Sequence, residues 1–109
     1  MILLQDFFIA GVAYHEYQMA TKLKAGSSLR LVGEPSNKHD PLAIKIMFND
    51  FKLGYVPTEL CKTFWDIHKR GVKIQAVLLS YNKQNVTHRM LRVRASYISK
   101  PEEEKEIVL

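Results

Sequence analysis

Tyrosines stand beside polar or turn residues at three places along the chain. Tyr14, Tyr55 and Tyr81 each lie at or near the end of a predicted strand. A ring that faces outward there stacks on an unpaired nucleic-acid base, and such stacking contributes about 1–3 kcal/mol per base. Alternatively, the rings close the rim of a small barrel and keep their hydroxyls in water. The residue types alone leave both interpretations open.

A polar loop bounded by Pro35 and Pro41 contains Lys38, His39 and Asp40. An ionised carboxylate only accepts hydrogen bonds, so Asp40 suits a hydroxyl ligand and repels a phosphate. The same carboxylate could instead cap the turn through its own backbone, as aspartates in loops commonly do. We keep both roles open for Asp40.

Several kinds of chemistry find no support in the sequence. Neither a P-loop nor a Gly-x-Gly-x-x-Gly segment is present, so we expect no nucleotide cofactor. The four histidines lack the spacing of a local metal site, and the single cysteine, Cys61, excludes an internal disulfide and a zinc site of several thiolates. A hydrolytic site built from His39, Asp40 and a distant serine is the least favoured alternative. We therefore expect a non-enzymatic protein without cofactor or metal.

Positive charge is concentrated in the middle of the chain. The net charge is +5 over 109 residues, but residues 101–109 carry −3 and residues 1–20 carry −2, so residues 21–100 carry +10. Such a segment attracts polyanions, whether nucleic acid, an anionic membrane surface or an acidic protein. The charge by itself does not choose among these partners.

The composition indicates one globular domain, since 47% of the residues are hydrophobic and 25% are charged. The lone cysteine favours a reducing compartment. The first residues lack the basic start of a signal peptide, and no apolar run reaches the length of a membrane span. We expect a soluble, cytoplasmic protein.

Six short segments show the patterns of strands. We expect strands over 7–14, 29–33, 43–48, 52–56, 72–81 and 90–98, with a bulge at Gly11, a hairpin turn at 49–50 and a polar turn at 82–85. Residues 15–23 predict a loop or a second short helix.

One helix interrupts this series of strands. Leu60, Phe64 and Ile67 recur at helical spacing, which predicts a helix over about 58–70. Thr58 is a suitable N-cap, and Gly71 marks the end of the helix. We expect Phe64 and the neighbouring Trp65 to lie in the core. A single inserted helix excludes a doubly wound sheet and favours an all-β fold, a small barrel of five to six strands like the oligonucleotide-binding (OB) fold.

Three blocks of sequence together resemble a HIRAN domain. They span residues 9–15 (IAGVAYH), 31–44 (LVGEPSNKHDPLAI) and 53–60 (LGYVPTEL). The middle block is the most diagnostic, because its E-P-x-N-x-x-D-x-x-A-I pattern matches the family in order and spacing. The resemblance extends over residues 1–99 and leaves 100–109 as an acidic C-terminal tail. The type that the chain resembles is the free-standing HIRAN domain found in bacteria and phages.

The resemblance implies a modified OB barrel and a binding function. In the proteins that remodel replication forks, HIRAN domains bind the 3′-hydroxyl end of single-stranded DNA: terminal bases stack on aromatic side chains and an aspartate contacts the terminal hydroxyl. In those proteins the domain is fused to an SNF2-type ATPase. The implied partners are therefore single-stranded DNA and a helicase or SNF2-type ATPase on another chain. The alternative is a protein-interaction domain that keeps the barrel but has lost the DNA site.

The family's DNA-binding residues carry over only in part. Tyr14 and Asp40 match the first-block tyrosine and the loop aspartate. His39 replaces the loop aromatic, and Tyr55 stands where a phosphate-contacting histidine occurs. The arginine before the first-block tyrosine is Ala13 here, which removes a phosphate contact.

Tyr81 corresponds to a later stacking aromatic of the family. Lys38, Lys52 and Lys83 lie in turns beside these positions, where they could restore the lost positive charge as contacts to phosphate.

Overall fold

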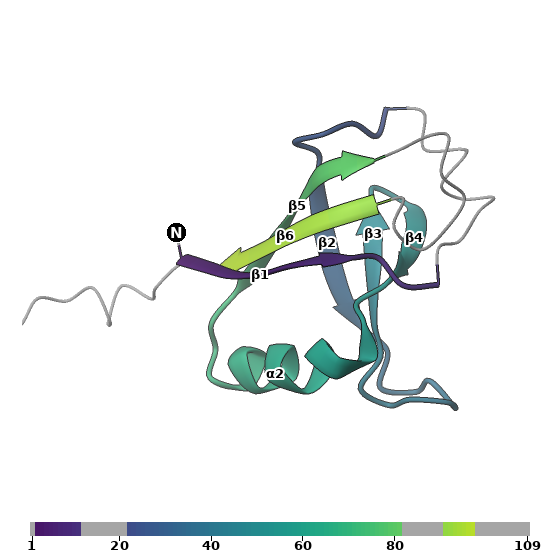
Figure 1. Cartoon of the computed structure of the whole chain (residues 1–109). Coiled ribbons are helices and arrows are strands. Elements are labelled where there is room, and N and C mark those ends of the chain that lie inside the picture. Colours follow the sequence, from purple (N-terminus) through teal and green to yellow (C-terminus); the bar gives the residue numbers. More distant parts are fainter. Residues whose placement is uncertain (1, 12–21, 82–90, 98–109) are drawn as a thin grey trace, which may run out of the picture.

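The computed structural model describes residues 2–11, 22–81 and 91–97, which form six strands and one helix (Figure 1). These elements are β1 (Ile2–Phe8), β2 (Ser28–Gly33), β3 (Ile44–Phe48), β4 (Phe51–Tyr55), α2 (Thr58–Lys69), β5 (Ile74–Tyr81) and β6 (Leu91–Tyr97). The predicted all-β fold with one inserted helix is therefore confirmed. The predictions of a second short helix and of a turn at 82–85 fall on residues that lie outside the described part, apart from 22–23.

The strands form an antiparallel sheet in the order β1-β6-β5-β2-β3-β4. Among the described residues, the two edges of the sheet meet at one point, where Ala10, just after β1, bridges Tyr55 on β4 through backbone hydrogen bonds of 2.9 and 2.8 Å. The sheet is curled but does not close into a continuous ladder. The domain is accordingly a partly open barrel.

Gly54 allows the two ends of the sheet to approach each other. Its φ is +152°, and a Cβ there would collide with Ile9 Cγ2 and lie 2.6 Å from the carbonyl oxygen of Ala10. The register of β3 and β4 also shifts at this point, which makes Leu53 an extra residue on β4. The glycine and the bulge together bend β4 toward the Ala10 bridge.

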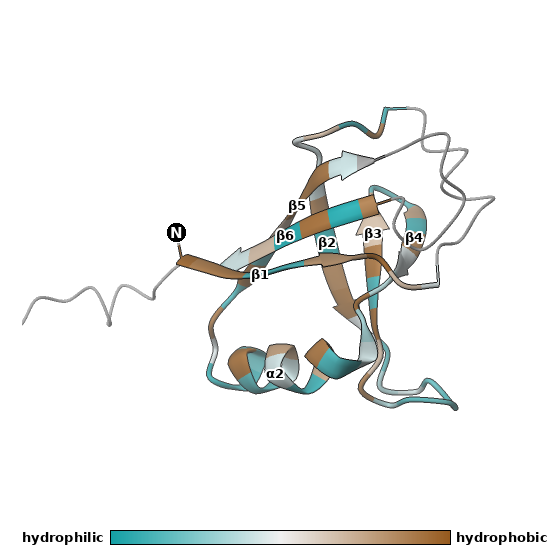
Figure 2. Ribbon diagram, viewed as in Figure 1, coloured by the Kyte–Doolittle hydropathy of each residue, from teal (hydrophilic) through white to brown (hydrophobic). Residues whose placement is uncertain are grey.

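Alternating side chains separate the core from the outer surface. Leu91, Val93 and Ala95 of β6 are buried, whereas the intervening Arg92 and Arg94 are exposed, and Figure 2 shows this alternation along the strand. This is the pattern of a strand with one buried face and one face in water.

The helix contributes Phe64 to the same core. Phe64 is 2% exposed and meets the ring of Phe7 from β1 edge to face at 6.0 Å between centroids. In Figure 1, α2 lies below the strands. The prediction of Phe64 as a core residue is confirmed, whereas Trp65 is only half-buried and packs at the edge of the core.

The ends of α2 differ slightly from the prediction. Thr58 is the first helical residue and not the N-cap; Pro57 occupies the cap position and makes no side-chain cap hydrogen bond. The predicted stop is confirmed, because Gly71 has a φ of +78° and its N–H donates to the His68 carbonyl at 2.8 Å.

The first strand begins earlier than the sequence predicts. β1 starts at Ile2 and runs through Gln5 and Asp6, and the described part ends at Gly11, so the predicted strand over 7–14 is wrong in its start. Asp6 is compatible with a strand because Arg94, its neighbour on β6, binds both carboxylate oxygens at 2.8 and 2.9 Å. This partner is 88 residues away, which local periodicity does not detect.

Candidate functional site

The loop between β2 and β3 is held in shape by its own polar side chains. Asn37 is central, since its Nδ2 donates to Glu34 Oε1 at 3.0 Å. Its Oδ1 accepts from the backbone N–H groups of His39 and Asp40 at 2.9 and 3.1 Å. These bonds fix the backbone that carries both predicted ligand residues.

Asp40 takes part in the same loop structure. Its Oδ1 accepts from the backbone N–H of Leu42 at 2.9 Å, and its carbonyl accepts from the Ala43 N–H at 3.0 Å. The capping role that the sequence left open is thus present for one carboxylate oxygen. The side chain is half-buried, while the adjacent Lys38 and His39 are exposed.

Tyr55 joins this loop to β4. Its hydroxyl donates to Glu34 Oε1 at 2.9 Å and accepts from Lys52 Nζ at 2.5 Å. The Lys52 ammonium also lies 4.3 Å from the centre of the Tyr55 ring, which is a cation–π geometry. A second lysine, Lys45, places its Nζ 3.9 Å from Glu34 Oε2. The tyrosine ring is consequently held in one position at the surface.

These contacts set the ionisation of Glu34. The hydrogen bond from Asn37 is the largest influence, and the Tyr55 hydroxyl and the charges of Lys52 and Lys45 act in the same direction. Together they outweigh the opposing effect of desolvation and hold the pKa of Glu34 below its ordinary value. The carboxylate is therefore ionised at neutral pH and acts as the anchor of the network.

The structure connects some of the predicted site residues and leaves others undescribed. Hydrogen bonds lead from Lys52 through Tyr55, Glu34 and Asn37 to the backbone of His39 and Asp40. Gly11 lies beside the Tyr55 ring, because a Cβ on it would be 3.8 Å from Tyr55 Cδ2. Three predicted positions (Ala13, Tyr14 and Lys83) and the Tyr81 side chain lie outside the described residues.

Sequence reasoning assigned no role to Glu34, Asn37 or Lys45. Glu34 and Asn37 both belong to the diagnostic E-P-x-N block, and their i,i+3 spacing in a loop was the available signal. The alternation of β3 already places Lys45 on the face opposite Ile44 and Ile46, but its proximity to Glu34 depends on the pairing of β2 with β3.

The described residues form neither a metal-binding cluster nor a membrane-spanning helix. Among residues 2–11, 22–81 and 91–97, no three His, Cys, Asp or Glu side chains gather into a group that could hold a metal ion. The helical part of the described chain lacks the length and apolar character needed to cross a bilayer.

Two solved structures share the fold of this chain. A crystal structure of a protein from Lactobacillus plantarum superposes with a TM-score of 0.72 at 20% identity, covering 86% of this chain and 91% of the other. The HIRAN domain of human HLTF superposes with a TM-score of 0.68 at 19% identity, covering 95% of this chain and 84% of that domain.

Sequence comparison relates the chain to a known family. It is 30% identical over 88 residues to a Fanconi-associated nuclease 1 homolog from Oryza sativa subsp. japonica. This alignment covers 76% of this chain but only 9% of that protein. The sequence profile of the HIRAN domain family matches residues 2–100. This match spans all the described elements, from β1 to β6, and it confirms the family that the three sequence blocks resemble. The chain belongs to the HIRAN domain family.

Proposed function

We propose that this chain is a non-enzymatic nucleic-acid-binding module that grips single-stranded DNA at 3′-hydroxyl ends. The observation that carries the proposal is the network in which Glu34 holds the Tyr55 ring and Lys52 next to the loop of His39 and Asp40. An aromatic face, a cation and a carboxylate are thereby attached to one rigid support. This combination suits the base, the phosphate and the terminal sugar of an unpaired strand.

Preorganisation is the physical advantage of this arrangement. A ring and an ammonium group that are already fixed lose little conformational entropy when a base stacks or a phosphate approaches. The +10 charge of residues 21–100 adds long-range attraction for the backbone of the strand. Stacking accepts every base, so the expected preference is for unpaired strands and not for a sequence.

Asp40 would distinguish the end of the strand. One of its oxygens accepts from the Leu42 N–H, which orients the carboxylate and leaves it a further oxygen as an acceptor for a terminal hydroxyl. A terminal phosphate would be repelled by the negative charge. Tyr14 and Tyr81 would provide further stacking faces, and Lys38 and Lys83 further phosphate contacts.

The relatives support the same function. The rice relative is named as a nuclease homolog, and this chain spans about a tenth of its length. A domain that occupies so small a part of a larger protein is suited to deliver nucleic acid to activities located elsewhere. The proposed partners are accordingly single-stranded DNA and a helicase or SNF2-type ATPase on another chain, in the cytoplasm.

The decisive experiment separates the charge of Asp40 from its structural hydrogen bond. The Asp40→Asn variant keeps an oxygen that accepts from Leu42 N–H but loses the charge, whereas Asp40→Ala loses both. Binding of fluorescent oligonucleotides with 3′-hydroxyl or 3′-phosphate ends would be measured at several salt concentrations. We expect the wild type to prefer the 3′-hydroxyl and Asp40→Asn to lose this preference without a loss of stability.

Tyr14→Ala provides the complementary variant. It should weaken binding to all single strands, with either end, because a stacking face does not depend on the terminal group. Binding by the wild type that is equal for both ends and independent of salt would refute the proposal. Equal losses in Tyr14→Ala and Asp40→Asn would contradict the roles assigned to the two residues.

A further inference from the structure

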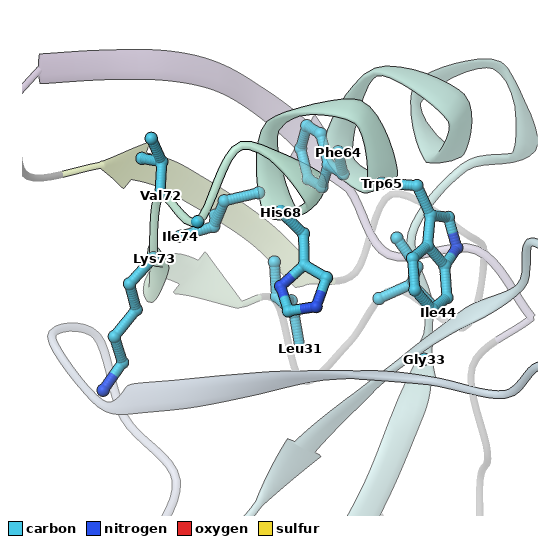
Figure 3. Close-up of a pocket in the computed structure, with 10 residues that line it drawn as sticks. Leu31, Gly33, Ile44, Phe64, Trp65, His68, Val72, Lys73 and Ile74 are labelled. Atoms are coloured by element: carbon cyan, nitrogen blue, oxygen red, sulfur yellow. The ribbon is translucent and has the colours of Figure 1, made fainter.

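A cleft lies between α2 and the strands β2 and β5 (Figure 3). Its volume is about 370 Å³, within the range of ligand-binding clefts. Leu31, Ile44, Phe64 and Ile74 give it apolar walls. Figure 3 shows Trp65 and His68 extending from the helix toward β2 across this space. The cleft is therefore an apolar slot beneath the last two turns of α2.

The hydrogen-bonded ladder between β2 and β5 ends before it reaches this slot. The ladder between β2 and β5 ends at Leu29 and Ala76, so Leu31 and Gly33 have no ladder partner on β5. The Glu34 N–H donates to the carbonyl oxygen of Ala43, the residue before β3, and so points away from β5. Along an antiparallel strand, the backbone groups of successive residues point alternately to the two neighbouring strands. Gly33 and Leu31 therefore direct their N–H and C=O groups toward β5, and Ile74 directs its own toward β2 by the same alternation.

The rim of the cleft is basic. Lys73 and His68 line it, and Arg30 and Lys73 line the adjoining groove between β2 and β5. Lys69 is exposed at the end of the helix beside them. None of the described residues that line the cleft or the groove is an aspartate or a glutamate. A ligand with acidic groups on either side of an apolar group complements this charge pattern.

We propose that the cleft binds an extended peptide segment of a partner protein, in which an apolar side chain is flanked by acidic residues. The peptide backbone would add to the open edge of β2 at Leu31 and Gly33, while the apolar side chain enters the slot under Trp65. Lys73 and its basic neighbours would pair with the flanking carboxylates. None of the described residues that line the cleft belongs to the network around Glu34, and this proposal does not rest on the proposed nucleic-acid function.

The cleft suits a peptide better than a nucleobase. The indole N–H of Trp65 donates to the Leu42 carbonyl at 2.8 Å, so it has no donor left for a base edge. Phe64 is almost completely buried and offers no stacking face. The backbone groups that Leu31 and Gly33 direct toward β5, without a ladder partner on that strand, are instead the feature that an extended polypeptide matches.

Trp65 provides a direct test, because it is the single tryptophan of the chain and lies in the cleft. The probe is an acetylated, amidated peptide of sequence EELELEE, titrated into the full chain while Trp65 emission is recorded. We expect a saturable change in emission. An analogue with lysine in place of every glutamate should produce none.

Charge reversal at the rim locates the site. Lys73→Glu should weaken binding of the acidic peptide by about tenfold or more, because attraction is replaced by repulsion. Lys62→Glu is the matched control, since Lys62 carries the same charge on α2, is exposed and does not line the cleft. It should change the affinity less than about twofold.

N-methylation of the peptide tests the strand pairing. Methyl groups on the alternate amides that face β2 should abolish binding, while methylation of the other amides should preserve it. The proposal is overturned if the acidic peptide does not bind, if both methylated peptides bind equally, or if Lys73→Glu has no effect. Displacement of the peptide by oligo-dT would also overturn it and would assign the cleft to nucleic acid. A Trp65 emission that depends on protein concentration alone would overturn it and assign the cleft to a second copy of the chain.

Discussion

The Tyr55 hydroxyl donates a hydrogen bond of 2.9 Å to Glu34 Oε1 and so connects β4 with the loop after β2. Both residues belong to the blocks of sequence that identify the family, but they are 21 positions apart. The same carboxylate oxygen accepts from Asn37, whose side-chain oxygen holds the backbone before Asp40. The geometry of the loop and the position of the tyrosine ring thus depend on one carboxylate.

Tyr55→Phe should lower the free energy of unfolding by about 1–2 kcal/mol, because it removes a hydrogen bond to an ionised group and keeps the ring. Urea unfolding would measure the loss. A double-mutant cycle with Glu34→Gln isolates the pair, and the two losses should be less than additive. Fully additive losses would show that the hydroxyl and the carboxylate stabilise the domain independently.

The pH dependence of stability should show the depressed pKa of Glu34. Because the pKa is lower in the folded than in the unfolded state, Glu34 contributes stability at pH values above its ordinary pKa of 4.5, and this contribution is lost as the pH falls below that value. Glu34→Gln should remove this part of the acid sensitivity. Urea unfolding at neutral pH and at acidic pH, for both proteins, checks the prediction.

A folded-state titration gives the independent control. The carboxyl resonance of Glu34, followed by NMR, should titrate below 4.5, and Asn37→Ala should raise its midpoint because the largest hydrogen bond is removed. An unchanged midpoint in Asn37→Ala would contradict the assignment.

Gly54→Ala should destabilise the domain by at least about 2 kcal/mol, because the new Cβ is strained at positive φ and collides with the segment after β1. Gly26→Ala is a matched control: its φ is +91°, but a Cβ there meets nothing within 4 Å. Both positions have positive φ, so we expect the larger cost at Gly54 to come from the collision. Faster hydrogen exchange at the Ala10 and Tyr55 amides should accompany the loss, and equal costs for the two variants would contradict the explanation.

Gly33→Ala should displace Trp65. A Cβ at this position would lie 2.5 Å from the Cη2 and Cζ2 atoms of the indole, which the Leu42 carbonyl holds in place. We expect a loss of about 1–3 kcal/mol and a red shift of the tryptophan emission. In a Trp65→Leu background the same substitution should cost clearly less, and an equal cost in both backgrounds would show that the indole is not the obstacle.

Cys61 should resist thiol reagents while the domain is folded. Desolvation is the main cause that raises the pKa of this thiol above 9.0, and the side chain is only 2% exposed. Modification by a disulfide reagent should therefore follow unfolding, with a rate that rises steeply in urea. Rapid modification of the native protein would contradict the buried position.

The sequence alone predicted those features that depend on neighbouring residues. The strands β2, β3 and β6, the turn at Asn49 with its φ of +53° and the stop at Gly71 were predicted from the sequence, because strand pleat, turn and helix end are set within a few residues. The diagnostic block likewise identified the family before any fold was known.

Long-range pairing decided the remainder. The early start of β1 depends on Arg94 of β6, and the anchor role of Glu34 depends on Tyr55 of β4. The cleft opens where the ladder between β2 and β5 stops at Leu29. Residues of β2, β5 and α2 line it. Local periodicity specifies which face of a strand is buried, but only the tertiary structure determines which distant side chains meet, since that depends on the order and register of the whole sheet.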